Sequence, residues 1–411
     1  MLKNFIKKWI FIFIIIVANL IIGLKVSVGF FHFFFYFLLS TIVLNFIWIL
    51  VQYFGTSLSL KRKLVGQIIE DDSLEITALI KNKGFVPVFN LVLEDWSSCA
   101  DPAERKKRFL LDYLGGGLSS VINYSYVCHN RGKYEIGPFC VYFFDFFGLF
   151  FLKRTYRLYS QLYVYPKTIN IKKLPALSKG AVPWFGLVTS PSAGDDDEFY
   201  GLREYRAGDP IKKIHWISSA RHNQLIIKQF QRQSFFKATL IFNLEKENNF
   251  GEGKETVLEY TVKLAASITK YLLDRGISLQ VITHTTEAVH IPFNKGPEHL
   301  NDIFKFLATL KSESKVSLGE LLEESSNHIP SGSNLIVIML DREWKYFPTL
   351  LPLEKRDLTL MPLIMISSTF VSIFGDKEVI RGTKIQFSKM FNFTPLFISR
   401  GDNLEKTFLV F

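Results

Sequence analysis

Two long apolar runs at the start of the chain restrict what it can fold into. Residues 9–24 read WIFIFIIIVANLIIGL, and residues 28–54 contain no Asp, Glu, Lys or Arg. About 20 apolar residues in a row are enough for a helix to cross a membrane. We therefore expect residues 1–60 to form two transmembrane helices joined by the short connection 25–27. The second run is longer than a bilayer requires, so we expect it to tilt.

The distribution of positive charge favours a membrane location over nucleic-acid binding. The net charge is +11, but the first 63 residues hold seven basic residues and no acidic one, which leaves only +4 for the rest of the chain. By the positive-inside rule, both ends of the hairpin and all later domains face the cytoplasm. Residues 61–63, KRK, should meet anionic lipid headgroups, and no nucleic-acid partner is expected. The seven basic residues are Lys3, Lys7, Lys8, Lys25, Lys61, Arg62 and Lys63.

Two polar side chains inside the apolar runs are candidates for a contact between the helices. If the connection folds the runs back to back, Asn19 and His32 lie at similar depth. A lone polar group is unfavourable in hydrocarbon, so we hypothesise a hydrogen bond between them. The alternative is that each bonds to its own backbone or faces lipid headgroups. A cleaved signal peptide does not fit the first run, because Leu24-Lys25-Val26 lacks the small residues of a cleavage site.

Between residues 61 and 170 the apolar pattern changes to alternation. Period two predicts half-buried strands, and glycine-containing turns separate them. We expect a β-sandwich of seven or eight strands with an immunoglobulin-like arrangement. Three cysteines lack the spacing of a metal site or a disulfide framework, so we expect free thiols. The alternating positions are Leu74, Ile76, Ala78 and Ile80 in one segment and Ile122, Tyr124, Tyr126 and Cys128 in a later one. The two other cysteines are Cys99 and Cys140.

An arginine-rich run follows a linker predicted for residues 171–197. It reads EFYGLREYRAGDPIKKIHWISSARHNQLIIKQF from residue 198, and we call residues 198–235 the signature segment. Asp209 and Pro210 suit the N-cap and first position of a helix that would extend to about Ala220. The residues singled out for their chemistry are Arg203, Arg206, Gly208, Asp209, His215, Trp216, Ser219 and Arg221.

The signature segment admits two interpretations. In a membrane-bound hydrolase, Ser219 would be the nucleophile, His215 the base and Asp209 the acid that orients the base. In a binding element, the arginines would pair with Asp209, Glu204 or backbone carbonyls, with Trp216 buried beside them. No strained Gly-x-Ser-x-Gly turn accompanies the serine, so the second interpretation is favoured. The segment is then a structural clasp between domains or a surface that docks a partner.

From residue 236 to residue 411, buried strands alternate with amphipathic helices. Helical spacing begins near Glu255 and again at Pro297, and Ser317 with Glu320 has the spacing of a capping box for a third helix. This alternation predicts an α/β domain with a mostly parallel sheet that is covered on both faces. The predicted strands are 238–245, 277–284, 287–293, 334–341 and 358–367.

The signature segment resembles that of a bacterial family known as domain of unknown function 58. Two further motifs of that family lie in the predicted sandwich, RGKYEIGP at 131–138 and DFFGLF at 145–150, where Phe146 replaces a proline of the family pattern. The resemblance implies a membrane-anchored protein with a von Willebrand factor A-like domain at 236–411. It also implies a MoxR-type AAA+ ATPase as partner, and a role in envelope maintenance or the maturation of other proteins.

The von Willebrand A resemblance also implies a place for a divalent cation. The motif Asp-x-Ser-x-Ser follows the first strand of such domains, where this chain has Asn243, Glu245 and Glu247. Both serines and the first aspartate are lost. Glu245 and Asp341 could still supply carboxylates, but we predict no metal and no cofactor. Because their loops follow the carboxyl ends of strands, we expect Glu245 and Asp341 to face a partner.

Together these patterns predict a protein that binds rather than catalyses. Its parts are a transmembrane helical hairpin, a β-sandwich and a mostly parallel α/β domain. Its expected partners are the lipid bilayer and a MoxR-type ATPase or another protein. The alternative is the membrane-bound hydrolase that uses His215 and Ser219.

Overall fold

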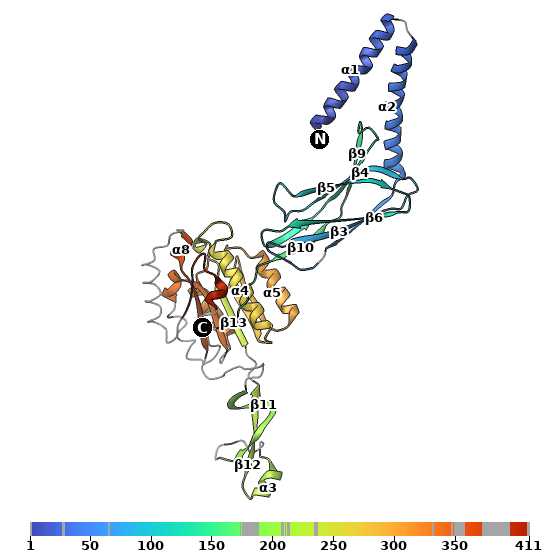
Figure 1. Ribbon diagram of the computed structural model, residues 1–411. Coiled ribbons are helices and arrows are strands. Elements are labelled where there is room, and N and C mark those ends of the chain that lie inside the picture. The colour runs from blue at the N-terminus through green and yellow to red at the C-terminus, as the bar shows by residue number, and fades with distance from the viewer. Residues whose placement is uncertain are drawn as a thin grey trace. The chain divides into compact units, whose positions relative to one another are not determined.

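The computed structural model divides the chain into two compact units, Met1–Tyr165 and Pro166–Phe411. Figure 1 follows the chain from its two N-terminal helices to the C-terminal α/β domain. Each unit is built around apolar cores of its own. The structure describes residues 2–26, 29–64, 66–172, 174, 189–206, 209, 211, 214–233, 237–330, 333–346, 348, 358–371 and 395–408.

The chain begins with helices α1 (Leu2–Val26) and α2 (Gly29–Gly55), which pack against each other as a hairpin (Figure 1). Both helices are long and apolar enough to cross a membrane, α1 over Lys7–Lys25 and α2 over its whole length. The residues predicted to span the membrane therefore do form two long apolar helices.

The polar side chains hypothesised to link these helices do not pair. Asn19 Nδ2 donates to Ile15 O of its own helix at 2.9 Å. A side-chain amide one turn from a carbonyl is satisfied locally, so the hydrogen bond between Asn19 and His32 is wrong and the alternative for Asn19 is correct. His32 lies beside Gly23, where a Cβ would be only 3.4 Å from the imidazole. Because Gly23 has no side chain, the imidazole ring of His32 has room between the helices.

Ten strands follow α2 in the described part of the first unit, and they form three small sheets. Their orders are β1-β3-β6, β5-β4-β8-β9 and β2-β10-β7. Apolar side chains of the first two sheets share one core, which makes them the two layers of a β-sandwich. Alternation in β3 is confirmed, because all four predicted positions are buried. The bounds are β1 Leu58–Leu64, β2 Ile68–Ile69, β3 Ser73–Asn82, β4 Val88–Trp96, β5 Lys106–Leu114, β6 Ser119–Val127, β7 Gly132–Ile136, β8 Phe139–Phe144, β9 Phe151–Tyr156 and β10 Ser160–Tyr165.

The basic run at 61–63 is part of strand β1. The side chain of Arg62 is fully buried and forms an ion pair with Asp95. The same guanidinium donates to Ile136 O at 2.9 Å. Lys61 and Lys63 are exposed, because successive residues of a strand point to opposite faces. The predicted contact of this run with lipid headgroups is therefore wrong for Arg62, whose charge is used inside the sandwich.

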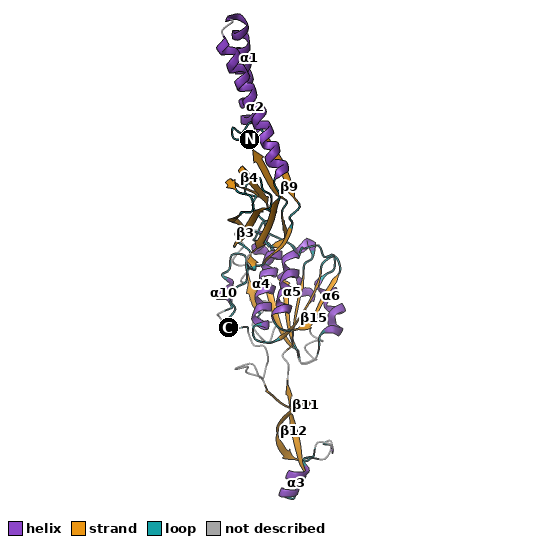
Figure 2. Cartoon of the chain, turned by 90° about the vertical axis from the view of Figure 1, so that its right-hand side faces the viewer, coloured by secondary structure: helices purple, strands orange, loops and turns teal. Residues whose placement is uncertain are grey.

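The second unit is built on a six-stranded sheet of order β15-β14-β13-β16-β17-β18. All neighbouring strands are parallel except β14 and β15, so the mostly parallel sheet is confirmed. Helices α4 and α5 cover one face and α6 covers the other (Figure 2). The bounds are β13 Lys237–Asn243, η2 Lys246–Asn248, α4 Val257–Leu273, β14 Ser278–His284, β15 Ala288–Asn294, α5 Pro297–Thr309, α6 Leu318–Ser325, η3 Ser326–His328, β16 Asn334–Leu340, η4 Asp341–Tyr346, β17 Thr359–Met365, α8 Ser367–Val371, β18 Leu396–Ile398 and α10 Leu404–Thr407.

Local signals in the sequence fix the helix starts of this unit. The Thr256 side chain caps α4 by accepting from Glu259 N. Pro297 is the first residue of α5, as predicted. The capping box at Ser317 and Glu320 is present at the start of α6. Each signal satisfies N–H groups that a helix start leaves unpaired or, for proline, removes one of them.

Part of the predicted linker 171–197 belongs to ordered elements. Ile171 and Leu174 are buried in the core to which α4 contributes. Further along, β11 (Thr189–Glu204) pairs antiparallel with β12 (Ile226–Gln233), with helix α3 (Trp216–His222) between them. Residues 175–188 lie outside the described residues. The linker prediction is therefore wrong for Ile171 and Leu174 at one end and for residues 189–197 at the other. Two isolated apolar residues and a mostly polar strand have no periodic pattern from which this could be predicted.

Candidate functional site

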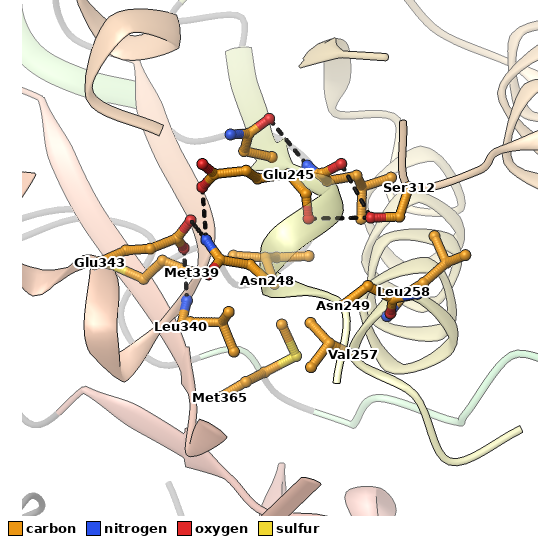
Figure 3. A pocket seen from close by; sticks show the side chains of 13 residues that line it. Glu245, Asn248, Asn249, Val257, Leu258, Ser312, Met339, Leu340, Glu343 and Met365 are labelled. Atoms are coloured by element: carbon orange, nitrogen blue, oxygen red, sulfur yellow. Dashed lines mark hydrogen bonds between the residues drawn. The ribbon is translucent and has the colours of Figure 1, made fainter. Parts of the chain in front are cut away.

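The six-stranded sheet has a switch point between β13 and β16. From β13 the chain continues to β14 on one side, whereas β16 leads to β17 on the other. In open α/β sheets, this arrangement leaves a crevice outside the carboxyl ends of the two strands. A shallow crevice of about 10 Å³, partly open to solvent, lies there (Figure 3). The loops that carry Glu245 and Asp341 both begin at this edge of the sheet.

Two carboxylates from different loops meet in the crevice through one amide. Asn248 Nδ2 donates to Glu245 Oε2 at 2.7 Å and to Glu343 Oε1 at 3.4 Å (Figure 3). Glu343 Oε2 accepts from Leu340 N at 2.8 Å. An amide nitrogen carries two hydrogens and can serve two acceptors at once. The two short 3-10 helices η2 and η4 thus hold the acids of the crevice in fixed positions.

Glu343 is the more buried of the two acids, with 5% of its surface exposed. Burial raises the pKa of Glu343 to about 7; the Leu340 N–H opposes this rise, and the charges of Glu245 and Asp341 add to it. Burial and the neighbouring Glu247 also raise the pKa of Glu245. With its pKa near 7, Glu343 is therefore protonated in part of the molecules at neutral pH.

The loop after β13 is tied to the segment that precedes α6. Asn243 Nδ2 donates to Val316 O at 2.6 Å, and its Oδ1 accepts from Leu244 N at 2.9 Å. Ser312 Oγ lies 3.1 Å from both Leu244 O and Glu245 O (Figure 3). These bonds set the backbone of the crevice independently of any ligand.

The residues at the positions of the cation motif do not suit a divalent cation. The Asn243 amide is already committed to backbone groups, and Glu247 is exposed. Asp341 Oδ1 accepts from Ser367 N at 3.0 Å. Within the described residues, no group of three or more His, Cys, Asp and Glu side chains is placed to hold a metal. A hard cation requires six or more oxygen ligands, and these residues do not supply them.

In the signature segment, Arg203 forms the bidentate pair expected from its chemistry. Its two terminal nitrogens lie 2.7 and 2.6 Å from the oxygens of Asp209. Hydrogen bonds from Arg203 and from Arg206 N hold the pKa of Asp209 down to about 2. The predicted N-cap role of Asp209 depends on Pro210, which lies outside the described residues. Helix α3 starts only at Trp216, and the His215 side chain caps it.

The predicted hydrolase constellation is not assembled. Ser219 is 8% exposed, and its Oγ donates to His215 O at 3.0 Å and accepts from Ile226 N at 2.9 Å. His215 Nδ1 lies 2.7 Å from Ser218 Oγ instead. Asp209 pairs with Arg203 rather than with the imidazole. A nucleophile needs a base at its hydroxyl, and here the Ser219 hydroxyl joins α3 to β12.

The other residues singled out in the segment are exposed where the structure describes them. Trp216 is 65% exposed and Ile217 66%, so the prediction of a buried tryptophan is wrong. Trp216 begins a two-turn helix whose buried face is contributed by Ser219. Arg206 and Arg221 have exposed side chains with no hydrogen-bond or ion-pair partner within the described part of the chain. Gly208 lies outside the described residues.

Sequence reasoning missed the residues that bridge the two loops. Glu343 and Asn248 belong to no motif, and their meeting depends on the parallel pairing of β13 with β16. The available signal was indirect: an acidic residue soon after each of two neighbouring buried strands. Asp341, the residue singled out in that loop, instead binds the backbone of α8 at Ser367.

The fold and the crevice define a class of protein with two apolar N-terminal helices, a β-sandwich and an open α/β sheet with an acidic switch point. Residues 201–338 match the model of a family described as "Protein of unknown function DUF58". The match covers the signature segment from Gly201 and extends through β13 into β16, in accord with the resemblance of the sequence motifs.

One curated relative and two solved structures give weaker similarities. The "Uncharacterized protein YeaD" of Bacillus subtilis (strain 168) is 22% identical over 253 residues, which are 59% of this chain and 59% of that protein. The CARDB domain of the PF1109 protein from Pyrococcus furiosus is 15% identical, with a TM-score of 0.21, covering 27% of this chain and 94% of that domain. Proximal thread matrix protein 1 from the mussel byssus is 15% identical, with a TM-score of 0.22, covering 31% of this chain and 35% of that one. These TM-scores are too low to carry an inference about fold or function.

Proposed function

We propose that this protein is a membrane-anchored binding protein, without catalytic activity, that holds a protein partner at the crevice of its α/β domain. The observation that carries the proposal is the pair Glu245 and Glu343, bridged by Asn248 at the switch point. The crevice encloses only about 10 Å³, room for about one water molecule, which is far below the ~300–1,000 Å³ of typical sites for small molecules. Its acidic lining suits one basic side chain presented by a partner.

The partner class proposed is a MoxR-type AAA+ ATPase, and the role is envelope maintenance or the maturation of protein complexes. The resemblance of the signature segment supports this choice, and its exposed arginines and Trp216 offer a second contact surface. The von Willebrand A-like character of the α/β domain and the immunoglobulin-like character of the sandwich belong to the same proposal. The strand order, third-second-first-fourth-fifth-sixth, is one of the doubly wound orders.

The proposed location is a bacterial inner membrane, crossed by α1 and α2, with both termini and the folded domains in the cytoplasm. Lys3, Lys7 and Lys8 before the first span support this orientation. The length and apolar composition of both helices support the crossing.

Affinity purification of the full chain from membranes tests the binding proposal. An AAA+ ATPase should co-purify with the wild-type protein. Glu245→Gln should reduce its recovery roughly tenfold or more, because a charge-assisted hydrogen bond across an interface contributes ~1.5–3 kcal/mol. Glu247→Gln is the matched control, since Glu247 is exposed and two residues away. Equal recovery of the ATPase with both variants would exclude the crevice as the binding site, and absence of any ATPase would exclude the partner.

A further inference from the structure

The DFFGLF motif forms a loop beside the two N-terminal helices, and we call residues 145–150 the β8–β9 loop. Trp9 of α1 donates from Nε1 to Leu149 O at 2.9 Å. The Phe150 ring lies 5.3 Å from the ring of Trp9 and 5.2 Å from that of Phe46 in α2. Figure 1 shows the same end of the sandwich beside α2. The loop thus contacts both helices of the hairpin.

The contacts lie at the depth where the hairpin leaves the hydrocarbon. Trp9 and Phe46 are each about 18 residues from the connection at 27–28, which is ~27 Å along a helix and close to the ~30 Å of a bilayer core. Tryptophan gathers at the headgroup boundary of membranes, and Trp48 lies close to the same level. Beyond this level, Ile49 and Gln52 of α2 are buried, and Ile49 belongs to the core of the sandwich.

The β8–β9 loop exposes two adjacent phenylalanines at this level. Phe146 is 56% exposed and stacks on Trp48 at 5.6 Å, and Phe147 is 59% exposed. Within the described residues, Phe147 makes no ring contact with another aromatic side chain. A Cβ at Gly148 would lie 3.6 Å from Lys8 Nζ, so a cationic group stands beside the same loop. Aromatic rings next to a lysine are the composition of a membrane-interface anchor.

The shape of the loop is fixed from inside the sandwich. Asp145 is 1% exposed, and its carboxylate accepts from Phe147 N at 3.2 Å and from Phe150 N at 2.7 Å. Gly148 has φ 63°, a left-handed conformation that glycine adopts without strain. The loop therefore presents Phe146 and Phe147 in a preset position, and little ordering entropy is lost when they meet a surface.

We propose that the β8–β9 loop is a third membrane contact, which inserts Phe147 and the exposed edge of Phe146 into the headgroup–acyl boundary of the bilayer crossed by α1 and α2. The occupant of this surface is lipid, because the loop is continuous with the lipid-facing surface of the hairpin. Lys8 lies where it meets lipid phosphates. The inference rests on the membrane anchoring in the proposed function, and it gives the motif a role besides turn formation.

Site-specific fluorescence of the full chain in liposomes of neutral and anionic phospholipid tests this contact. One polarity-sensitive label is attached at Phe147→Cys, at Ala103→Cys or at Phe37→Cys, and unsubstituted protein reports labelling of the buried native cysteines. Ala103 is the control on the sandwich: it follows β4, whose other end at Phe89 contacts Trp48, so it is ~20 Å or more further from the helices. Phe37 is in mid-α2 and 54% exposed, so a label at this position reports whether α2 lies in the bilayer.

The label at 147 should be quenched several-fold more strongly than the label at 103 by lipids with a spin label near the headgroup. It should also be several-fold less accessible to aqueous iodide. Equal iodide quenching at 147 and 103, with the label at 37 still quenched by lipid, would overturn the inference and leave the anchor intact. Shielding of 147 from both quenchers would assign the loop to a protein contact and overturn it as well. A label at 37 that lipids do not quench would remove the anchoring itself.

Discussion

Within the described residues, the buried acid Glu343 accepts hydrogen bonds from neutral donors alone. Leu340 N–H and the Asn248 amide donate to its two oxygens, and the charges of Glu245 and Asp341, which act on its ionisation, are both negative. A carboxylate in this environment gains less from its hydrogen bonds than it loses on leaving water. The crevice thus stores unfavourable electrostatic energy, which a basic side chain from a partner would relieve.

Glu343→Gln should make the second unit more stable at alkaline pH. The folded pKa, about 7, is above the unfolded value of 4.5, so the native state binds the extra proton between these values. The free energy of unfolding therefore falls as pH rises through this window, by ~3 kcal/mol in all, and the loss is complete above pH 7. Glutamine has no proton to lose. Denaturant unfolding of the variant should show no such slope between pH 5 and 8, and greater stability than wild type at pH 8.

Glu320→Gln is the matched control for this titration. Hydrogen bonds from Ser317 lower the pKa of Glu320, so it stays charged throughout the range from pH 5 to 8. Its replacement weakens the capping box of α6 but should leave the slope of stability against pH unchanged. The same slope in wild type and in Glu343→Gln would show that Glu343 is ionised and solvated in the folded protein.

Helix α2 serves two environments along its length. Ile47 is 49% exposed, whereas Ile49 is 1% exposed and packs in the core that also contains Leu91 and Phe143. Twenty-seven residues span ~40 Å, about 10 Å more than a bilayer core. Tilt was the expected use of the surplus length. The structure shows that the last turns also form part of the sandwich, so the helix joins the anchor to the folded domain.

Ile49→Ala should therefore destabilise the sandwich although it lies in an apolar span. Deleting a buried isoleucine side chain to alanine costs ~2–5 kcal/mol, because a cavity remains. Ile47→Ala, two residues earlier on the exposed side, should change stability little. Urea unfolding in detergent, followed through protection of the sandwich peptides from hydrogen exchange, measures both. Equal losses in the two variants would mean that the end of α2 is not part of this core.

What the sequence could predict differs between elements for physical reasons. Capping boxes, N-terminal prolines and alternating strands are local signals, and α5, α6 and β3 follow them. Arg62 was misjudged because its partner Asp95 is brought near only by the fold, whereas the pairing of Arg203 with Asp209, six residues apart, was expected from the sequence. The location of the crevice was predicted, because the loops that carry Glu245 and Asp341 follow the carboxyl ends of buried strands. Glu343 was not, since contacts across parallel strands leave no mark in a single sequence.

At the scale of the whole molecule, the two units keep separate apolar cores. The clusters of the first unit draw on α2 and the sandwich, and those of the second on the α/β sheet with Ile171 and Leu174. The boundary falls between Tyr165 and Pro166. A chain with separate cores is expected to unfold in separate cooperative steps.

The full chain should therefore show two unfolding transitions in detergent, each with its own sensitivity. Ile49→Ala should lower only the midpoint of the first unit, and Glu343→Gln at pH 8 should raise only that of the second. The double variant should show the sum of both effects, because distant sites without shared partners are additive. Hydrogen exchange read by mass spectrometry assigns each transition to its peptides. If both substitutions shifted one common midpoint, the units would be energetically coupled, and a partner bound at the crevice would then also stabilise the membrane-proximal sandwich.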